Sequence, residues 1–258
     1  MIDSHCHLYF DKFDKIRDEL VNESRAAGVH TIVNIGIDIK SSLQAISLTE
    51  QYDGLYATAG IHPHDAQNVD RDYISKLKDI CSHKKVVALG EIGLDFYRDI
   101  SPRNAQEKVF KEQLKLASDL NMPIVLHTRE SFDKTFEIIK EYASSLNGGI
   151  FHCFPGDIKQ AMAVIELGFH ISVGGVITFN NSSMADVAGE VPLKWLLLET
   201  DAPFLTPVPF RGKMNKSEYV KFVYEKLAEL RNESFTEIEK QIDRNGQKLF
   251  KLVDVFGE

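Results

Sequence analysis

Six side chains that can hold metal ions follow short apolar segments at five places in the sequence. They are His5, His7, Glu91, His127, His152 and Asp201. Imidazole and carboxylate groups are ligands that divalent metal ions accept. One histidine after an apolar run is more often a core or surface residue, but in parallel α/β proteins the carboxyl ends of the strands point at one site. The shared position of the six residues therefore predicts one metal centre.

His5 and His7 are one residue apart in an apolar segment, and side chains two positions apart in a strand lie on the same face. Both imidazoles can then reach one ion. Asp3 lies two residues earlier on that face, where it either orients a ligand or is a buried structural carboxylate. A pair of this kind is a weak signal alone, because it also occurs by chance.

Glu91 follows Gly90 and precedes Gly93 at the end of another apolar segment, so small neighbours leave room for an ion and a substrate. A buried carboxylate needs positive charge beside it. Its two oxygens can bridge two ions, and His127 and His152 would then serve the second ion. We expect two ions about 3.5 to 4 Å apart, with Glu91 between them.

Asp201 and Glu199 follow the last apolar segment and lie on one inward face. Asp201 is nearer the end, where it can bind the first ion and accept a proton from the attacking water. Glu199 lies deeper and either holds a histidine by its second nitrogen or belongs to an ordinary buried salt bridge.

His62 and His64 flank Pro63 after a third apolar segment. We expect His62 to stabilise charge on the attacked group or to protonate a leaving oxygen, the alternative being that it makes the loop rigid. His64 is a candidate substrate contact. The remaining histidines are expected at the other end of the fold in structural roles, and they are His30, His83 and His170.

Eight apolar, β-branched segments must position these groups. They cover residues 2–8, 31–37, 56–61, 86–92, 123–126, 149–154, 170–173 and 196–198. Segments with helical spacing lie between them, and we expect helix starts at Ser101 and at a capping box of Thr236 with Glu239. Strands that alternate with helices form an open doubly wound sheet or a closed barrel. Ligands after the first, fourth, fifth, sixth and eighth strands favour the barrel, so we predict one (β/α)8 TIM-barrel domain over residues 1–258.

Composition narrows the class of protein. The chain has a hydrophobic content of 43% and a net charge of −8, which are typical of a globular protein and not of one that coats nucleic acid by charge alone. No segment is long and apolar enough for a membrane span, and no signal segment precedes the first motif, so we expect a cytoplasmic protein. We expect no obligate protein partner.

The three cysteines are too few for a disulfide framework and fit a reducing compartment. Cys6 and Cys153 are each next to a proposed ligand. Strand alternation would turn both thiols away from the ligands and toward the covering helices. We therefore expect buried structural thiols and not metal ligands.

Several ordered motifs resemble those of the TatD family of metal-dependent deoxyribonucleases across essentially the whole chain. They cover residues 3–8, 60–64, 90–95, 127–129, 152–154 and 199–203. The resemblance implies a hydrolase barrel of the amidohydrolase type. It implies that His5, His7, Glu91 and Asp201 hold one divalent ion, and that the other is held by Glu91, His127 and His152.

Two departures from the family pattern concern the substrate side. The family usually has arginine, asparagine, glutamate and proline where this chain has residues 214–217, and an acidic residue where this chain has Tyr9. We expect neither departure to contact the proposed ligands.

We expect cleavage of a phosphodiester bond in DNA, either single-stranded or at strand ends, with Asp201, His62 and Glu91 as the catalytic groups. Candidate phosphate contacts are Arg129, Arg211 and Lys213. Aromatic residues that could stack on bases are Phe96, Tyr97, Phe154, Phe179 and Phe210.

Three alternatives stay open: an amide, ester or lactone hydrolase acting on a small molecule, an aminoacyl ester hydrolase, and a non-enzymatic partner protein. The ligand types do not distinguish Mg, Mn, Zn and Ni.

Overall fold

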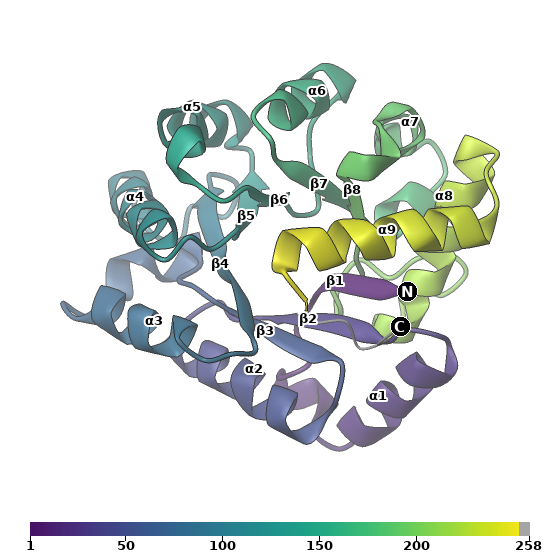
Figure 1. Cartoon of the computed structure of the whole chain (residues 1–258), viewed down its shortest axis with the longest axis horizontal. Helices are drawn as coiled ribbons and strands as arrows, with labels where there is room; N and C mark the ends of the chain where they lie inside the picture. Colours follow the sequence, from purple (N-terminus) through teal and green to yellow (C-terminus); the bar gives the residue numbers. More distant parts are fainter. Residues whose placement is uncertain (253–258) are drawn as a thin grey trace.

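Eight parallel strands form one sheet in sequence order, and the computed structural model describes residues 1–252 (Figure 1). The strands are β1 Ile2–Cys6, β2 Thr31–Ile35, β3 Leu55–Ala59, β4 Val86–Asp95, β5 Ile124–Arg129, β6 Gly149–Phe151, β7 His170–Val173 and β8 Leu196–Leu198. Nearly every strand residue is buried, as expected for a parallel sheet covered on both faces.

Helices surround the strands on the outside (Figure 1). They are α1 Arg17–Ala26, α2 Ile39–Gln51, α3 Tyr73–Cys81, α4 Arg103–Asp119, α5 Phe132–Tyr142, α6 Ile158–Glu166, α7 Ser183–Glu190, α8 Val220–Arg231 and α9 Phe235–Phe250. Helix α9 packs against β1 and β8, where the Asn245 amide donates to the Leu193 and Leu196 carbonyls at 2.8 and 2.7 Å. Among the described residues, no helix is both long and apolar enough to cross a bilayer.

Strands β1 and β8 meet at their carboxyl ends and bring the sheet nearly to closure. The His7 N–H donates to the Ala202 carbonyl and the Asp201 N–H donates to the His5 carbonyl, both at 2.9 Å. These two bonds confirm the predicted barrel and also place Asp201 beside His5 of β1 and His7, which follows the strand. The predicted domain extends to residue 258, and its last six residues lie outside the described part of the chain.

Strand β4 runs farther than the sequence predicts, to Asp95 rather than residue 92. Gly93 makes this extension possible, because it has φ +141° and a Cβ at this position would lie 2.1 Å from the His127 carbonyl oxygen. Only glycine lets β4 pass β5 this closely. The extension carries Asp95 to the same end of the barrel as Glu91.

Two predicted helix starts are wrong. Helix α9 is capped by Ser234 with Glu237, two residues before the expected Thr236. Helix α4 begins at Arg103 with no side-chain cap, and the Ser101 hydroxyl instead donates to the His64 carbonyl at 2.7 Å. Ser101 therefore holds the loop after β3, which carries His62 and His64.

Candidate metal centre

The two oxygens of the Glu91 carboxylate face two different groups of histidines. Glu91 Oε2 lies 3.5 Å from His5 Nε2 and 3.9 Å from His7 Nε2. Glu91 Oε1 lies 2.8 Å from His127 Nδ1 and 3.2 Å from His152 Nε2. Glu91 is only 4% exposed. One buried carboxylate thus joins histidines from β1 to histidines from β5 and the end of β6.

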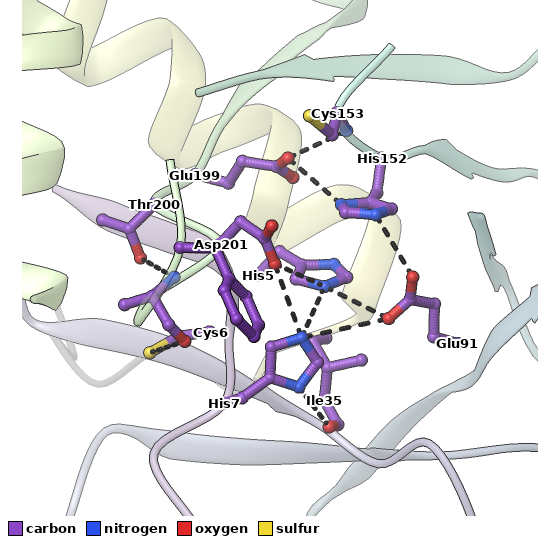
Figure 2. A network of polar contacts seen from close by, with 12 residues as sticks. His5, Cys6, His7, Ile35, Glu91, His152, Cys153, Glu199, Thr200 and Asp201 are labelled. Carbon is purple, nitrogen blue, oxygen red and sulfur yellow. Dashed lines mark hydrogen bonds and ion pairs between the residues drawn. The ribbon is translucent and has the colours of Figure 1, made fainter. Parts of the chain in front are cut away.

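Asp201 completes the β1 side of the site. Its Oδ1 lies 3.6 Å from His5 Nε2 and 3.5 Å from His7 Nε2. Figure 2 shows the rings of His5, His7 and His152 and the carboxylates of Glu91 and Asp201 turned toward one another. All six residues predicted as ligands therefore lie in one cluster, which we call the carboxyl-end cluster.

The second nitrogen of His7 fixes where its proton resides. His7 Nδ1 lies 3.1 Å from the Ile35 carbonyl oxygen, which can only accept a hydrogen bond. Nδ1 therefore donates to this carbonyl, and Nε2 is the nitrogen that faces Glu91 and Asp201. The Tyr9 hydroxyl also lies 3.2 Å from His7 Nδ1. The expectation that Tyr9 is remote from the proposed ligands is wrong.

Glu199 and Asp95 contact the ring nitrogens of His152 and His127 that point away from Glu91. Glu199 Oε1 lies 3.2 Å from His152 Nδ1 and accepts a hydrogen bond from the Cys153 N–H at 2.8 Å (Figure 2). Asp95 Oδ2 lies 3.1 Å from His127 Nε2. Carboxylates at the far nitrogen commonly orient metal-binding histidines and increase their basicity.

His62 and His64 occupy different positions. His62 Nε2 lies 3.6 Å from Glu91 Oε1, and His62 Nδ1 accepts a hydrogen bond from the His64 N–H at 3.2 Å. The neutral His62 ring therefore carries its proton on Nε2, which points into the cluster. His64 Nε2 instead lies 2.9 Å from Asp95 Oδ2, at the edge of the site.

Asp3 does not contact a histidine ring. Its carboxylate accepts hydrogen bonds from the Thr200 N–H at 2.9 Å, the Thr200 hydroxyl at 2.7 Å and the Ser217 hydroxyl at 2.6 Å. Burial raises the pKa of Asp3 to about 7 against the opposing effect of these bonds. Asp3 thus holds the backbone between Glu199 and Asp201, and Ser217, one of the departures from the family pattern, is part of this contact.

Cys6 and Cys153 differ in their exposure to solvent. Cys6 is buried, and its thiol lies 3.9 Å from the Ala202 carbonyl oxygen. Cys153 is partly exposed and lies beyond β6, which ends at Phe151, so strand alternation does not apply to it. Burial raises the pKa of Cys153 to about 12, which keeps it a neutral thiol. No cysteine belongs to a candidate metal-binding group in residues 1–252.

The ionisable groups of the cluster shift each other's pKa values. Burial alone would raise the pKa of Glu91, but His152, His127 and His5 hold it well below the usual range. Burial alone would lower the pKa of His152, but Glu199 and Glu91 raise it well above the usual value. Asp95 and Glu91 likewise raise the pKa of His127 against burial. Without ions, the carboxylates are therefore balanced by protons on histidines.

The donor set fits divalent cations. Three groups at this end of the described barrel have ligand atoms within 4.8 Å of one another: His5 with His152 and Asp201, His5 with His7 and Glu91, and His62 with Glu91 and His127. In residues 1–252 no lysine or arginine forms an ion pair with the carboxylates of the site, which are Glu91, Asp95, Glu199 and Asp201. Buried carboxylates need such a charge, and metal ions can supply it.

The predicted phosphate contacts lie on the surface and outside this cluster. The guanidinium of Arg129 is 4.1 Å from the centroid of the Tyr97 ring, and that of Arg211 is 3.9 Å from the centroid of the Phe179 ring. The Lys213 ammonium is 5.4 Å from the centroid of the Phe210 ring. All three cations are exposed and lie at the same end of the barrel as the cluster, Arg129 as the last residue of β5 and Arg211 and Lys213 on the loop after β8.

Comparison with known proteins gives the family. The profile of the family described as TatD related DNase matches residues 2–251. The chain belongs to the TatD family. A Bacillus subtilis relative of this TatD protein, named uncharacterized metal-dependent hydrolase YabD, is 39% identical over 253 residues, which cover 98% of this chain and 99% of the relative.

Two further relatives support membership of the TatD family. The 3'-5' ssDNA/RNA exonuclease TatD of Klebsiella pneumoniae is 33% identical over 263 residues and the full length of both chains. The crystal structure of YjjV, a TatD homolog from Escherichia coli K12, superimposes with a TM-score of 0.92 at 34% identity and covers 98% of each chain. The resemblance seen in the sequence motifs is confirmed, and the protein is a metal-dependent hydrolase of the TatD family.

Sequence reasoning missed Asp95 and Tyr9 in this TatD family member. Asp95 is four residues after Glu91, an even spacing that places both side chains on one face of a strand, so this signal was present. Tyr9 lies beyond the end of β1, where strand periodicity says nothing. Its contact with His7 depends on the turn that follows.

Proposed function

We propose that this TatD family protein is a divalent-metal-dependent exonuclease that hydrolyses phosphodiester bonds of single-stranded DNA, including strand ends. The observation that carries the proposal is the Glu91 carboxylate, whose two oxygens each face a separate pair of histidines. A carboxylate in this position can bridge two ions, and paired ions suit in-line displacement at phosphorus. The exonuclease name of the Klebsiella relative supports the substrate class.

The ligands divide between two ions around Glu91. We assign His5, His7, Asp201 and Glu91 Oε2 to one ion. We assign His127, His152 and Glu91 Oε1 to the other. Ions bound there would supply Lewis acidity, lower the pKa of water and offset the charge of the site's carboxylates.

Asp201 and His62 are the groups of the chain that we assign to proton handling. His7 and His5 lower the pKa of Asp201 although burial alone would raise it, so the carboxylate is ionised and can accept a proton from the attacking water. His62 directs Nε2–H into the cluster, where it can donate a hydrogen bond to an oxygen of the attacked phosphoryl group.

We assign residues at the edge of the site to contacts with the nucleic-acid strand. Arg129, Arg211 and Lys213 are exposed cations at this end of the barrel and suit phosphates that are not cleaved. His64, which Asp95 holds at 2.9 Å, can donate to a neighbouring phosphate.

The test uses metal-stripped protein and end-labelled single-stranded DNA, to which Mg²⁺, Mn²⁺, Zn²⁺ or Ni²⁺ is added in turn, with Glu91→Gln as the control. The proposal predicts that at least one ion restores stepwise shortening of the strand and that the Gln variant stays inactive. Parallel reactions with RNA, an aminoacyl ester, a lactone and an amide test hydrolysis at carbon. Hydrolysis of only the carbon substrates, or equal cleavage by Glu91→Gln, would overturn the nuclease assignment.

A further inference from the structure

Exposed apolar side chains gather at the end of the barrel that holds the metal centre. Residues 1–252 contain seven exposed large apolar side chains, and five of them lie on two loops, after β4 and after β8. These five are Tyr97, Ile100, Phe204, Leu205 and Val208. Because exposed apolar surface is costly, its concentration beside a candidate active site indicates a surface that contacts a ligand.

Phe204 and Phe10 extend the aromatic surface of the metal centre toward solvent. The Phe10 ring is stacked with the ring of His7 at 5.2 Å and 16°, and the Phe204 ring meets Phe10 edge to face at 5.9 Å. Phe204 is 46% exposed, and the ammonium of exposed Lys12 lies 5.1 Å from its ring centroid. The face of the Phe204 ring is therefore within reach of groups from solvent.

Tyr97 forms a matching feature on the β4 and β5 side. It is 55% exposed, and its N–H donates to Asp95 Oδ1 at 3.0 Å, so its backbone is fixed to the carboxylate that contacts His127. The guanidinium of Arg129 lies over its ring. In the strand order, β4 and β5 are across the barrel from β1 and β8, so the metal centre lies between the two features.

We propose that Phe204 and Tyr97 are two base-stacking platforms that hold nucleosides of one single strand on either side of the scissile phosphate. This inference rests on the proposed nuclease function and adds the residues that select the substrate. An aromatic ring stacks on any base, whereas the bases of a duplex are already stacked on each other. When a base covers the ring, Lys12 or Arg129 is released to contact the adjacent phosphate. The platforms therefore select single-stranded nucleic acid.

The test is a cycle between protein variants and abasic strands. We compare cleavage by the full-length, metal-loaded parent with cleavage by Phe204→Leu and Tyr97→Leu. The substrates are a short single-stranded DNA and the same strand with one abasic site at each position in turn. Base stacking on an aromatic side chain predicts that each Leu variant loses about 5- to 100-fold in kcat/KM on the intact strand, mainly through KM. For each variant, an abasic site at one particular position should remove the difference from the parent.

Controls separate stacking from structural damage. Phe204→Trp keeps a stacking face and should restore most of the kcat/KM that Phe204→Leu loses. Leu43→Ala removes an exposed apolar side chain on helix α2 that belongs to neither platform, and it should have no effect. Metal content is measured for each variant. Equal cleavage by parent and Leu variants, or a loss that is the same on every abasic strand, would overturn the inference.

Binding of a fluorescently labelled strand, measured by anisotropy with the same variants, distinguishes this inference from the proposed function. If the parent binds but cleaves no strand, and the Leu variants bind more weakly, the platforms are supported and the nuclease function fails. If the parent cleaves and all variants bind and cleave equally, the nuclease function stands and the platforms fail.

Discussion

The two ends of the barrel each hold a cluster of histidine and carboxylate side chains, and only one of them needs an external cation. At the amino end, His30, Glu239 and Asp243 have ligand atoms within 4.8 Å of one another, as three-residue groups of the carboxyl-end cluster do. The ammonium of Met1 lies 2.8 Å from Glu239 Oε1 and 3.6 Å from Asp243 Oδ2. The chain thus balances this amino-end cluster with its own terminal charge.

The carboxyl-end cluster has no corresponding charge from a lysine, an arginine or the amino terminus in residues 1–252. The ion pairs of its carboxylates in this part of the chain are with imidazoles alone, and the carboxylates raise the pKa values of His127 and His152 in the absence of ions. The comparison shows that residue types and short distances do not define a metal site. What distinguishes the two clusters is whether the fold supplies the balancing cation.

The largest difference in kcat/KM is expected between two variants that each lose one carboxylate charge, one at either end of the barrel. Glu91→Gln keeps the shape of the side chain but removes the bridging charge, so kcat/KM for the strand should fall on the order of 1,000-fold, the scale seen when a group that stabilises a transition state is lost. Glu239→Gln, the matched change at the amino end, should leave kcat/KM within about twofold. Steady-state kinetics measures both variants. Equal losses of kcat/KM would show that the two clusters do not differ in function.

A smaller effect is expected for the carboxylates that orient histidines. Asp95→Asn should weaken metal affinity about 10- to 100-fold, because Asp95 contacts the outer nitrogen of His127. Asp243 contacts the ring of His30 in the same way at the amino end, but Asp243→Asn should leave metal affinity unchanged. Titration of stripped protein with Mn²⁺ or Zn²⁺ measures this. An unchanged affinity in Asp95→Asn would mean that its contact with His127 is structural.

The pH dependence of metal binding should be no larger, per pH unit, than the loss in Asp95→Asn, and it has a definite sign. His127 and His152 have raised pKa values and hold protons when no ion is bound, but each must be neutral to bind one. Affinity should therefore rise with pH up to the raised pKa values of the two histidines and level off above them, with a slope of up to about tenfold per pH unit for each proton released. Calorimetry in buffers with different ionisation enthalpies counts those protons. Binding without proton release would contradict the assigned protonation of these two histidines.

The smallest expected effect concerns the stability of the amino-end cluster. Asp243→Asn removes one partner of the Met1 ammonium and of His30, and Asp243 is 18% exposed, so the free energy of unfolding should fall by about 1 kcal/mol. Urea unfolding followed by circular dichroism measures it. If stability is unaffected, the ion pairs at this end contribute nothing measurable and the carboxylates there are simply solvated.

The positions that follow from strand periodicity were predictable from the sequence. The barrel and the gathering of His5, Glu91, His127 and Asp201 depend on which segments are strands and where each segment ends, and apolar runs show both. Asp95 escaped notice because the predicted strand stopped at residue 92, although its even spacing from Glu91 placed it on the same face.

Contacts between loops were not predictable. Phe10 and Phe204 are far apart in the sequence, and they meet only because the turns after β1 and β8 fold toward each other. The capping of α9 was misplaced by two residues because Ser234 and Thr236 each precede a glutamate by three positions. Local patterns of this kind identify a helix start without selecting between neighbouring registers.

Anomalous diffraction from crystals grown with Mn²⁺ locates bound ions at both ends of the barrel. Two peaks are expected at the carboxyl end, one beside each oxygen of Glu91, and no peak among His30, Glu239 and Asp243. A single peak away from Glu91, or a peak in the amino-end cluster, would contradict this expectation.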